Sequence, residues 1–375
     1  MVAALLTACG RRDFDPRPDG QDLQAVVQLA VGGKTACARL ASGDLWCWGA
    51  NGNLLLGADL TVASSPVPVR VRTPAPTIDL ELDDGAGGAR LAGGGAIGWG
   101  ANHYGQLGIG DTTSAPVPVV VPGADDAIAL SISSRDLCLV RADRTVACSG
   151  ESSEGMLGDG STTDRLTLGP VPGLANVMAL TSGTSHVCAL DGSGAATCWG
   201  RNVSGQLGDG TFTLRTTPVP GPVGPYTAIA AGDEFTCALR VDRGVDCWGS
   251  NLDLQLGDPA GGTRASAAKV PGIADATAIT AGSQHACALL ADRSVWCWGD
   301  DERAQLGDAL GDTSATPRRV DLDDVVEVNS RTDIATCART ADGAVWCWGD
   351  NLDGTIGNGQ VGGLVTAPSR VLGLP

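Results

Sequence analysis

The sequence contains few histidines, few phenylalanines and tyrosines, and little positive charge. Its 375 residues include three histidines, three phenylalanines and two tyrosines, and 25 Lys and Arg residues stand against 42 Asp and Glu residues. The formal net charge of −17 repels phosphate backbones and anionic lipid headgroups. We therefore expect no binding to nucleic acid.

Long apolar runs and the short motifs of common enzymes are also missing. No apolar run approaches the roughly 18 residues that a membrane-spanning helix needs. The sequence has no nucleophile elbow, no H-E-x-x-H pair and no phosphate-binding loop. We expect a protein that is not an enzyme and that needs no cofactor.

Tryptophan, by contrast, is abundant and confined to one recurring motif, of which Val295-Trp296-Cys297-Trp298-Gly299 is the clearest copy. All nine tryptophans lie in copies of this motif. The closing glycines recur about every 50 residues, a period typical of repeat proteins. They are Gly49, Gly100, Gly150, Gly200, Gly249, Gly299 and Gly349. Because one such unit cannot bury its apolar faces alone, this period, with short strands and 54 glycines, predicts a β-propeller.

Twelve of the thirteen cysteines form six pairs with one constant spacing. In the sixth unit a three-residue hairpin, Ala291 to Arg293, places Cys287 opposite Cys297, at a separation that a disulfide accepts. The second unit has Gly88 and Gly98 in place of the two cysteines. Because both cysteines are missing from the same unit, the two positions of a pair are expected to bond to each other. A zinc site is disfavoured because close ligand pairs are missing. The predicted disulfides are Cys37–Cys47, Cys138–Cys148, Cys188–Cys198, Cys237–Cys247, Cys287–Cys297 and Cys337–Cys347.

The loop that follows the tryptophan motif carries a second signature. In the fourth unit it reads W-G-x-N-x-x-G-Q-L-G-x-G from Trp199 to Gly210, and a proline-bounded strand at Pro218 to Pro220 follows. Together with a G-x-x-H turn, this pattern resembles the repeat of the regulator of chromosome condensation family over residues 23–375. Kelch repeats share the period but lack this loop.

The resemblance implies an all-β fold: a seven-bladed propeller with four-stranded antiparallel blades. The chain begins with the first three strands of a unit (Ala25 to Trp48) and ends with a fourth strand (Pro368 to Leu372). We therefore expect the ring to be closed by N- and C-terminal strands that pair in one blade. The family includes an exchange factor that binds chromatin and a secreted bacterial inhibitor of β-lactamases.

The N-terminus carries a different signal. Leu6-Thr7-Ala8-Cys9 resembles the lipobox of bacterial lipoproteins, which implies lipidation at Cys9. Only eight residues precede this cysteine, fewer than the roughly 15–30 of most export signals, so we expect the true start to lie upstream. Residues 1–8 are then part of a signal, residues 9–22 are a flexible tether, and the propeller spans 23–375. The expected location is the cell envelope (outer membrane or periplasm), with secretion as the alternative.

Two kinds of acidic segment allow either a structural or a functional interpretation. An aspartate recurs after the L-G of the long loop, where it either forms a turn or offers oxygen ligands to calcium. These residues are Asp111, Asp159, Asp209, Asp258 and Asp308. Further acidic clusters, at residues 79–84, 125–126 and 321–327, flank the starts of first strands. They are expected to be solvated turns or contacts for a basic partner.

We expect the chain to be a monomeric binding or scaffold protein. Its protein partner is unknown, and the acidic clusters would suit a basic one. We expect contact with a membrane only through the lipid. With tryptophan assigned to the core, few large aromatic residues remain as anchors. His103, Tyr104, Phe212 and Phe235 all belong to the face that holds the long loops, which we predict to be the binding face. The alternatives are a polysaccharide-active enzyme, a carbohydrate-binding propeller and an enzyme inhibitor.

Overall fold

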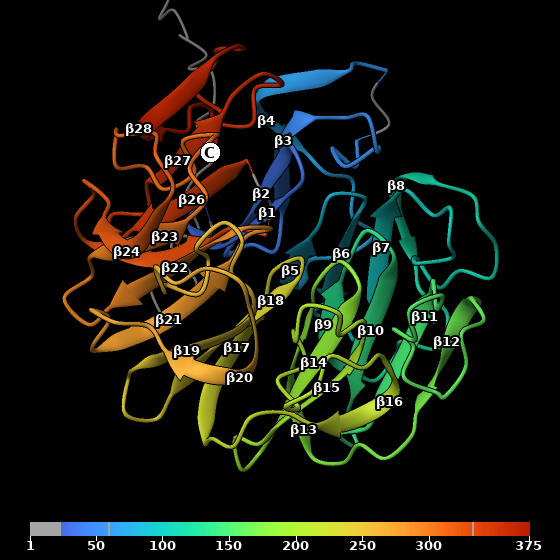
Figure 1. The fold of residues 1–375 in the computed structure, drawn as a ribbon. Coiled ribbons are helices and arrows are strands. Elements are labelled where there is room, and N and C mark those ends of the chain that lie inside the picture. Colours follow the sequence, from blue (N-terminus) through green and yellow to red (C-terminus); the bar gives the residue numbers. More distant parts are fainter. Residues whose placement is uncertain (1–23, 59–60, 332–333) are drawn as a thin grey trace, which may run out of the picture.

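A computed structural model describes residues 24–58, 61–331 and 334–375. It is a propeller of seven four-stranded antiparallel sheets around a common axis (Figure 1). None of the described residues forms a helix long and apolar enough to cross a membrane. The predicted all-β, seven-bladed fold is confirmed.

Each blade consists of four strands that are consecutive in the sequence. The first strands are β1 (Val26–Gly32), β5 (Thr77–Leu82), β9 (Ala127–Ile132), β13 (Val177–Ser182), β17 (Tyr226–Ala231), β21 (Ala276–Ala281) and β25 (Val325–Asn329). The second strands are β2 (Thr35–Leu40), β6 (Ala86–Leu91), β10 (Asp136–Arg141), β14 (His186–Asp191), β18 (Phe235–Arg240), β22 (His285–Leu290) and β26 (Ala335–Thr340).

The third and fourth strands complete the blades, which we number 1 to 7 in chain order. The third strands are β3 (Leu45–Ala50), β7 (Ala96–Gly100), β11 (Val146–Gly150), β15 (Ala196–Gly200), β19 (Val245–Ser250), β23 (Val295–Gly299) and β27 (Val345–Asp350). The fourth strands are β4 (Ser64–Arg70), β8 (Ala115–Val120), β12 (Arg165–Val171), β16 (Arg215–Pro220), β20 (Thr263–Lys269), β24 (Ser314–Arg319) and β28 (Leu364–Arg370). First strands of neighbouring blades lie side by side around the axis.

The expected closure by terminal strands within one blade is wrong. β28 pairs with β27 of its own unit, and β1 pairs with β2 of the first unit. The ring closes instead by packing blade 1 against blade 7, blue against red in Figure 1. Across this seam the backbone N–H groups of Leu29 and Val31 donate to the side chains of Glu327 and Asn329, both at 2.8 Å.

All six predicted disulfides are present, and each joins residues that are directly opposite in register. Cys287 and Cys297, for example, have Cα atoms 4.1 Å apart. The hairpin that sets this register has its third residue, Arg293, in the left-handed region at a φ of 66°. In blade 2, Gly88 and Gly98 occupy the same paired positions.

In six of the seven blades a tryptophan joins the blade to the one before it. The tryptophan before the closing glycine is fully buried in six blades and donates its indole N–H to a carbonyl oxygen of the preceding long loop. Trp298, for example, donates to Gln255 at 2.9 Å. The other members are Trp48, Trp99, Trp199, Trp248 and Trp348. Trp46, Trp296 and Trp346, two residues earlier in their strands, are only partly buried.

Candidate functional site

One face of the ring carries both the turns between first and second strands and the long loops between third and fourth strands. The long loop of one blade contacts the first turn of the next. Asn53 donates to the carbonyl oxygen of Asp84 at 2.7 Å, and Ser204 donates to Glu234 at 2.8 Å. We call this side of the ring the long-loop face, and the opposite side, with the hairpins between second and third strands, the hairpin face.

The centre of the long-loop face holds a cavity of about 400 Å³. Every blade contributes residues from the turn between its first and second strands. The lining residues are Gly33, Lys34, Asp83, Asp84, Ser134, Thr184, Asp233, Ser283, Arg331 and Ile334, together with Arg303 from a long loop. We call this cavity the central mouth.

Arg331 of blade 7 lines the central mouth and reaches across the axis. Its guanidinium donates to Glu81 Oε2 at 2.7 Å and to the carbonyl oxygen of Ser182 at 2.5 Å. Glu81 lies on β5 of blade 2 and Ser182 on β13 of blade 4, so the Arg331 side chain links its own blade to two others. The Arg331 side chain is only 12% exposed. Such a bridge ties distant parts of the ring together.

Three carboxyl groups, those of Glu81, Asp83 and Asp136, surround the single guanidinium of Arg331. Burial raises the pKa of Asp83 to about 7, against the lowering effect of Arg331 and of the Asp84 N–H. Burial also raises the pKa of Asp136 to about 6, although Ser133 and Ser182 donate to its carboxylate. The pKa of Glu81 is raised for the same reason. The axis therefore holds more acid than one arginine neutralises.

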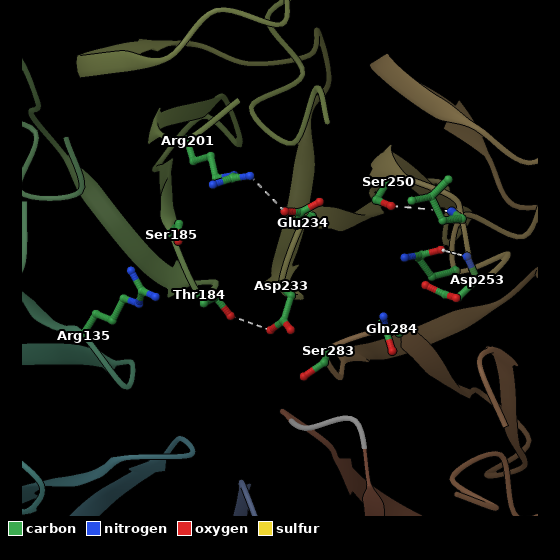
Figure 2. A pocket seen from close by; sticks show the side chains of 12 residues that line it. Arg135, Thr184, Ser185, Arg201, Asp233, Glu234, Ser250, Asp253, Ser283 and Gln284 are labelled. Atoms are coloured by element: carbon green, nitrogen blue, oxygen red, sulfur yellow. Dashed lines mark hydrogen bonds and ion pairs between the residues drawn. The ribbon is translucent and has the colours of Figure 1, made fainter. Parts of the chain in front are cut away.

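A second hollow of about 380 Å³ lies beside the central mouth, between blades 4, 5 and 6. Figure 2 shows polar side chains around it, with Arg201 directed at Glu234 and Thr184 at Asp233. The Thr184 hydroxyl donates to Asp233 at 2.5 Å. The two cavities share Thr184, Asp233 and Ser283. They form one depression that reaches from the axis toward blade 5.

The aspartates that recur in the long loops close those loops. Each accepts a hydrogen bond from the backbone N–H two residues later, at 2.8–2.9 Å. In four of the five, the second carboxylate oxygen also binds an arginine, as Asp209 binds Arg215. Within the described ranges no group of three or more His, Cys, Asp or Glu side chains is arranged to hold a metal ion. The geometry therefore gives these aspartates the turn role.

Part of the acidic clusters also differs from expectation. Asp79 and Glu81 lie within β5, and Glu327 lies within β25, not in solvated turns before these strands. Asp79 forms an ion pair with Arg90 at 3.0 Å, and Glu327 forms one with Arg339 at 3.0 Å. We expected these acids in turns because Asp and Glu are uncommon in β-strands, but they lie within the first strands themselves.

The predicted partner-binding residues separate into three that are accessible and one that is not. Tyr104 is 40% exposed and Phe212 is 52% exposed, and His103 is exposed beside Tyr104. They belong to blades 2 and 4, with blade 3 between them, so they form no single cluster. Phe235 is fully buried, and its assignment to a binding surface is wrong.

Phe235 is buried because the first residue of β18 points into the layer between blades. His186 and His285 occupy the same position in their blades and are equally buried. The Nε2 atom of His186 lies 2.9 Å from the Thr236 hydroxyl, and burial lowers the pKa of this histidine to about 4. Thr236 in turn donates to the carbonyl oxygen of Gln206. These contacts give His186 and His285 a structural role in the layer between blades.

Arg331 is the residue that the sequence analysis missed. In blades 1, 4, 5 and 6 the corresponding turn position holds Gly32, Gly183, Gly232 and Gly282. The turn of blade 7 is also one residue longer. The replacement of a recurrent glycine by arginine could have been recognised in the sequence as a sign that this position has a special role.

The comparisons with known proteins agree with this architecture. The family model described as the RCC1-like domain matches residues 6–335, and a regulator of chromosome condensation (RCC1) repeat matches residues 335–355.

Among solved structures, human WBSCR16 is 20% identical with a TM-score of 0.78, covering 88% of this chain and 96% of that one. Prp20p of Saccharomyces cerevisiae, whose binding to Gsp1p and histones is reported, is 20% identical with a TM-score of 0.73, covering 82% and 80%. At these identities the likeness shows the fold alone.

A curated relative, the probable E3 ubiquitin-protein ligase HERC4 of Mus musculus, is 37% identical over 103 residues. This match covers 26% of the present chain and 9% of the ligase. The chain therefore spans only a small part of that relative.

Proposed function

Because this chain belongs to the RCC1-like domain family, we propose that it is a non-enzymatic binding protein that contacts another protein through its long-loop face. The observation that carries this proposal is the depression formed by the central mouth and the hollow beside it. It is concave, polar and built by turns from every blade. Binding residues usually lie on such loops of a rigid scaffold. Tyr104 and Phe212 are exposed aromatic residues on the same face.

The cysteines support a proposal about the compartment. Six disulfides in one chain are typical of proteins in oxidising compartments. We propose that the protein is exported and acts as a monomer in the cell envelope. Cys9 lies outside the described residues, so its lipidation stays a prediction. Labelled palmitate should mark the protein, and Cys9→Ala should abolish the label.

Partner capture tests the proposal. The purified propeller, immobilised in oxidising buffer, should retain a protein from an envelope extract, and Tyr104→Ala or Phe212→Ala should weaken retention. Asp321→Ala is the matched control, because Asp321 is an exposed acid in the link between β24 and β25 on the hairpin face. Retention lost with Asp321→Ala but kept with both aromatic variants would place binding on the other face. Turnover of polysaccharides by the same preparation would instead favour the enzymatic alternative.

A further inference from the structure

We propose that the hollow between blades 4, 5 and 6 takes a lysine or arginine side chain of the protein partner and that Asp253 is the carboxylate that pairs with it. This inference rests on the proposed function and adds the chemistry of the contact. It concerns the hollow lined by Asp253, Ser250, Ser185, Glu234 and Leu252, among others.

The positive charges at the hollow are already neutralised by acids of the protein. Arg135 pairs with Glu151 at 3.0 Å, and Arg201 pairs with Glu154 at 3.2 Å. Neither Glu151 nor Glu154 lines the hollow. Arg201 also pairs with Glu234, which does line the hollow, at 3.5 Å. An anionic ligand would therefore have to compete with three existing ion pairs.

Asp253 is in the opposite situation. Within the part of the chain that the structure describes, no Lys or Arg lies within ion-pair distance of its carboxylate. Partial burial raises the pKa of Asp253, and the negative charges of Asp300 and Glu302 raise it further. A cation in the hollow would pair with Asp253, which lines it, and would offset the repulsion that Asp253 receives from Asp300 and Glu302.

Two serines at the hollow, both largely buried as residues, offer hydroxyl groups that a peptide carrying the cation could engage. Ser250 is 3% exposed, and its oxygen accepts a bond of 3.5 Å from the Leu252 N–H but donates none to the described residues. Ser185 is 8% exposed, and its hydroxyl makes no hydrogen bond in the same ranges. Both line the hollow. A hydroxyl donor needs an acceptor, and the carbonyl groups of a peptide supply one.

The size and rim of the hollow fit such a side chain. Its volume of about 380 Å³ is at the lower end of ligand pockets in general, which hold roughly 300–1,000 Å³. Leu252 on the rim is 72% exposed. The apolar stem of lysine or arginine packs on such a surface while its charged end stays with the carboxylate. The described residues offer no group of three ligands for a metal cation.

The probe is the peptide acetyl-Gly-Ser-Gly-Arg-Gly-Ser-Gly-amide, titrated into the ¹⁵N-labelled propeller at pH 7.5 and low salt. We expect saturable shifts of the Ser250 and Asp253 amide signals. The same peptide with citrulline, which keeps the shape of arginine without its charge, should bind about tenfold more weakly, because hydrogen bonds to a charged group are stronger than neutral ones. Lysine in place of arginine should bind within a few-fold.

Asp253→Asn should weaken the arginine peptide by a similar factor of about ten. Asp321→Asn, which makes the same change of charge on the hairpin face, should leave its dissociation constant unchanged. Equal binding of the arginine and citrulline peptides, or equal effects of the two variants, would overturn the inference. Capture of an envelope protein that Asp253→Asn does not weaken would also overturn it while leaving the proposed function intact.

Discussion

The indole N–H of Trp48 donates a hydrogen bond to the carbonyl oxygen of Thr355 at 2.9 Å, although 307 residues of sequence separate them. The equivalent bond within the ring joins Trp298 to Gln255, also at 2.9 Å. The seam between blades 1 and 7 is therefore held by the same bond as the internal interfaces. No strand exchange is needed to close the ring.

Trp48→Phe should destabilise the propeller to the same extent as Trp298→Phe. Both changes leave a buried carbonyl oxygen without its donor, which costs about 1–3 kcal/mol. Unfolding in guanidinium chloride, followed by circular dichroism, measures both. A much smaller loss for Trp48→Phe would mean that the seam contributes little and that the ring tolerates opening.

A seventh disulfide should form in blade 2 of the double variant Gly88→Cys, Gly98→Cys. These residues are opposite in register, and neither has a positive φ. Built Cβ atoms would lie 3.2 Å from Leu130 and 3.1 Å from Leu107, so the leucine ends must shift slightly. We expect a gain below the roughly 2.5–3 kcal/mol that chain entropy gives for a loop of about 11 residues.

Thiol titration and thermal unfolding test this bridge, with each single cysteine variant as a control. The double variant should show no free thiol from the new pair and a higher melting temperature than either single variant. Two reactive thiols in the folded double variant would contradict the register.

His186→Phe should reduce the loss of stability in mild acid. Burial lowers the pKa of His186 from 6.5 to about 4. The unfolded chain therefore binds more protons between these values, and the free energy of unfolding falls as pH falls from 6.5 toward 4. One such histidine contributes about 2 kcal/mol of loss between pH 7 and pH 5. Phenylalanine is suitable because blade 5 has Phe235 at this position.

Urea unfolding of the wild type and the variant at pH 7 and pH 5 provides the comparison. The difference in unfolding free energy between the two pH values should be smaller by about 2 kcal/mol in the variant. His285 remains in both proteins and cancels. An identical pH dependence would show that His186 takes up its proton in the folded state without penalty.

Arg331→Met should destabilise the ring more at pH 8 than at pH 5. The change leaves Glu81 and Asp83 without their cation, and removing one partner of a buried pair costs about 3–5 kcal/mol. Burial raises the pKa of Asp83 from 3.8 to about 7, so in the wild type this acid already lowers stability as pH rises from about 4 to 7. Without Arg331 the penalty on the ionised form grows.

The double variant Arg331→Met, Glu81→Gln is the matched control, because it removes both charges of the 2.7 Å pair. It should recover part of the stability at pH 8. Denaturant unfolding at both pH values measures this, and equal losses at pH 5 and pH 8 would contradict an electrostatic role for Arg331.

The sequence by itself determined the local pairings of this protein. The three-residue hairpin from Ala291 to Arg293 sets Cys287 opposite Cys297, because a short antiparallel loop allows one register. Because that unit repeats, the sequence alone predicted the seven blades, the disulfides and the burial of Trp298 and its counterparts. These features depend on residues close together in the chain.

Only the tertiary structure decided how the units meet. A fourth strand can in principle complete its own blade or the next, and β28 pairs with β27, which places the seam between sheets instead of inside one. Phe235 is buried by the neighbouring blade, which no pattern within its own unit reveals. Arg331 contacts Glu81, 250 residues away, because the ring brings the inner strands of distant blades to one axis. Contacts across that axis arise from the closed shape, and the period of the repeat carries no information about them.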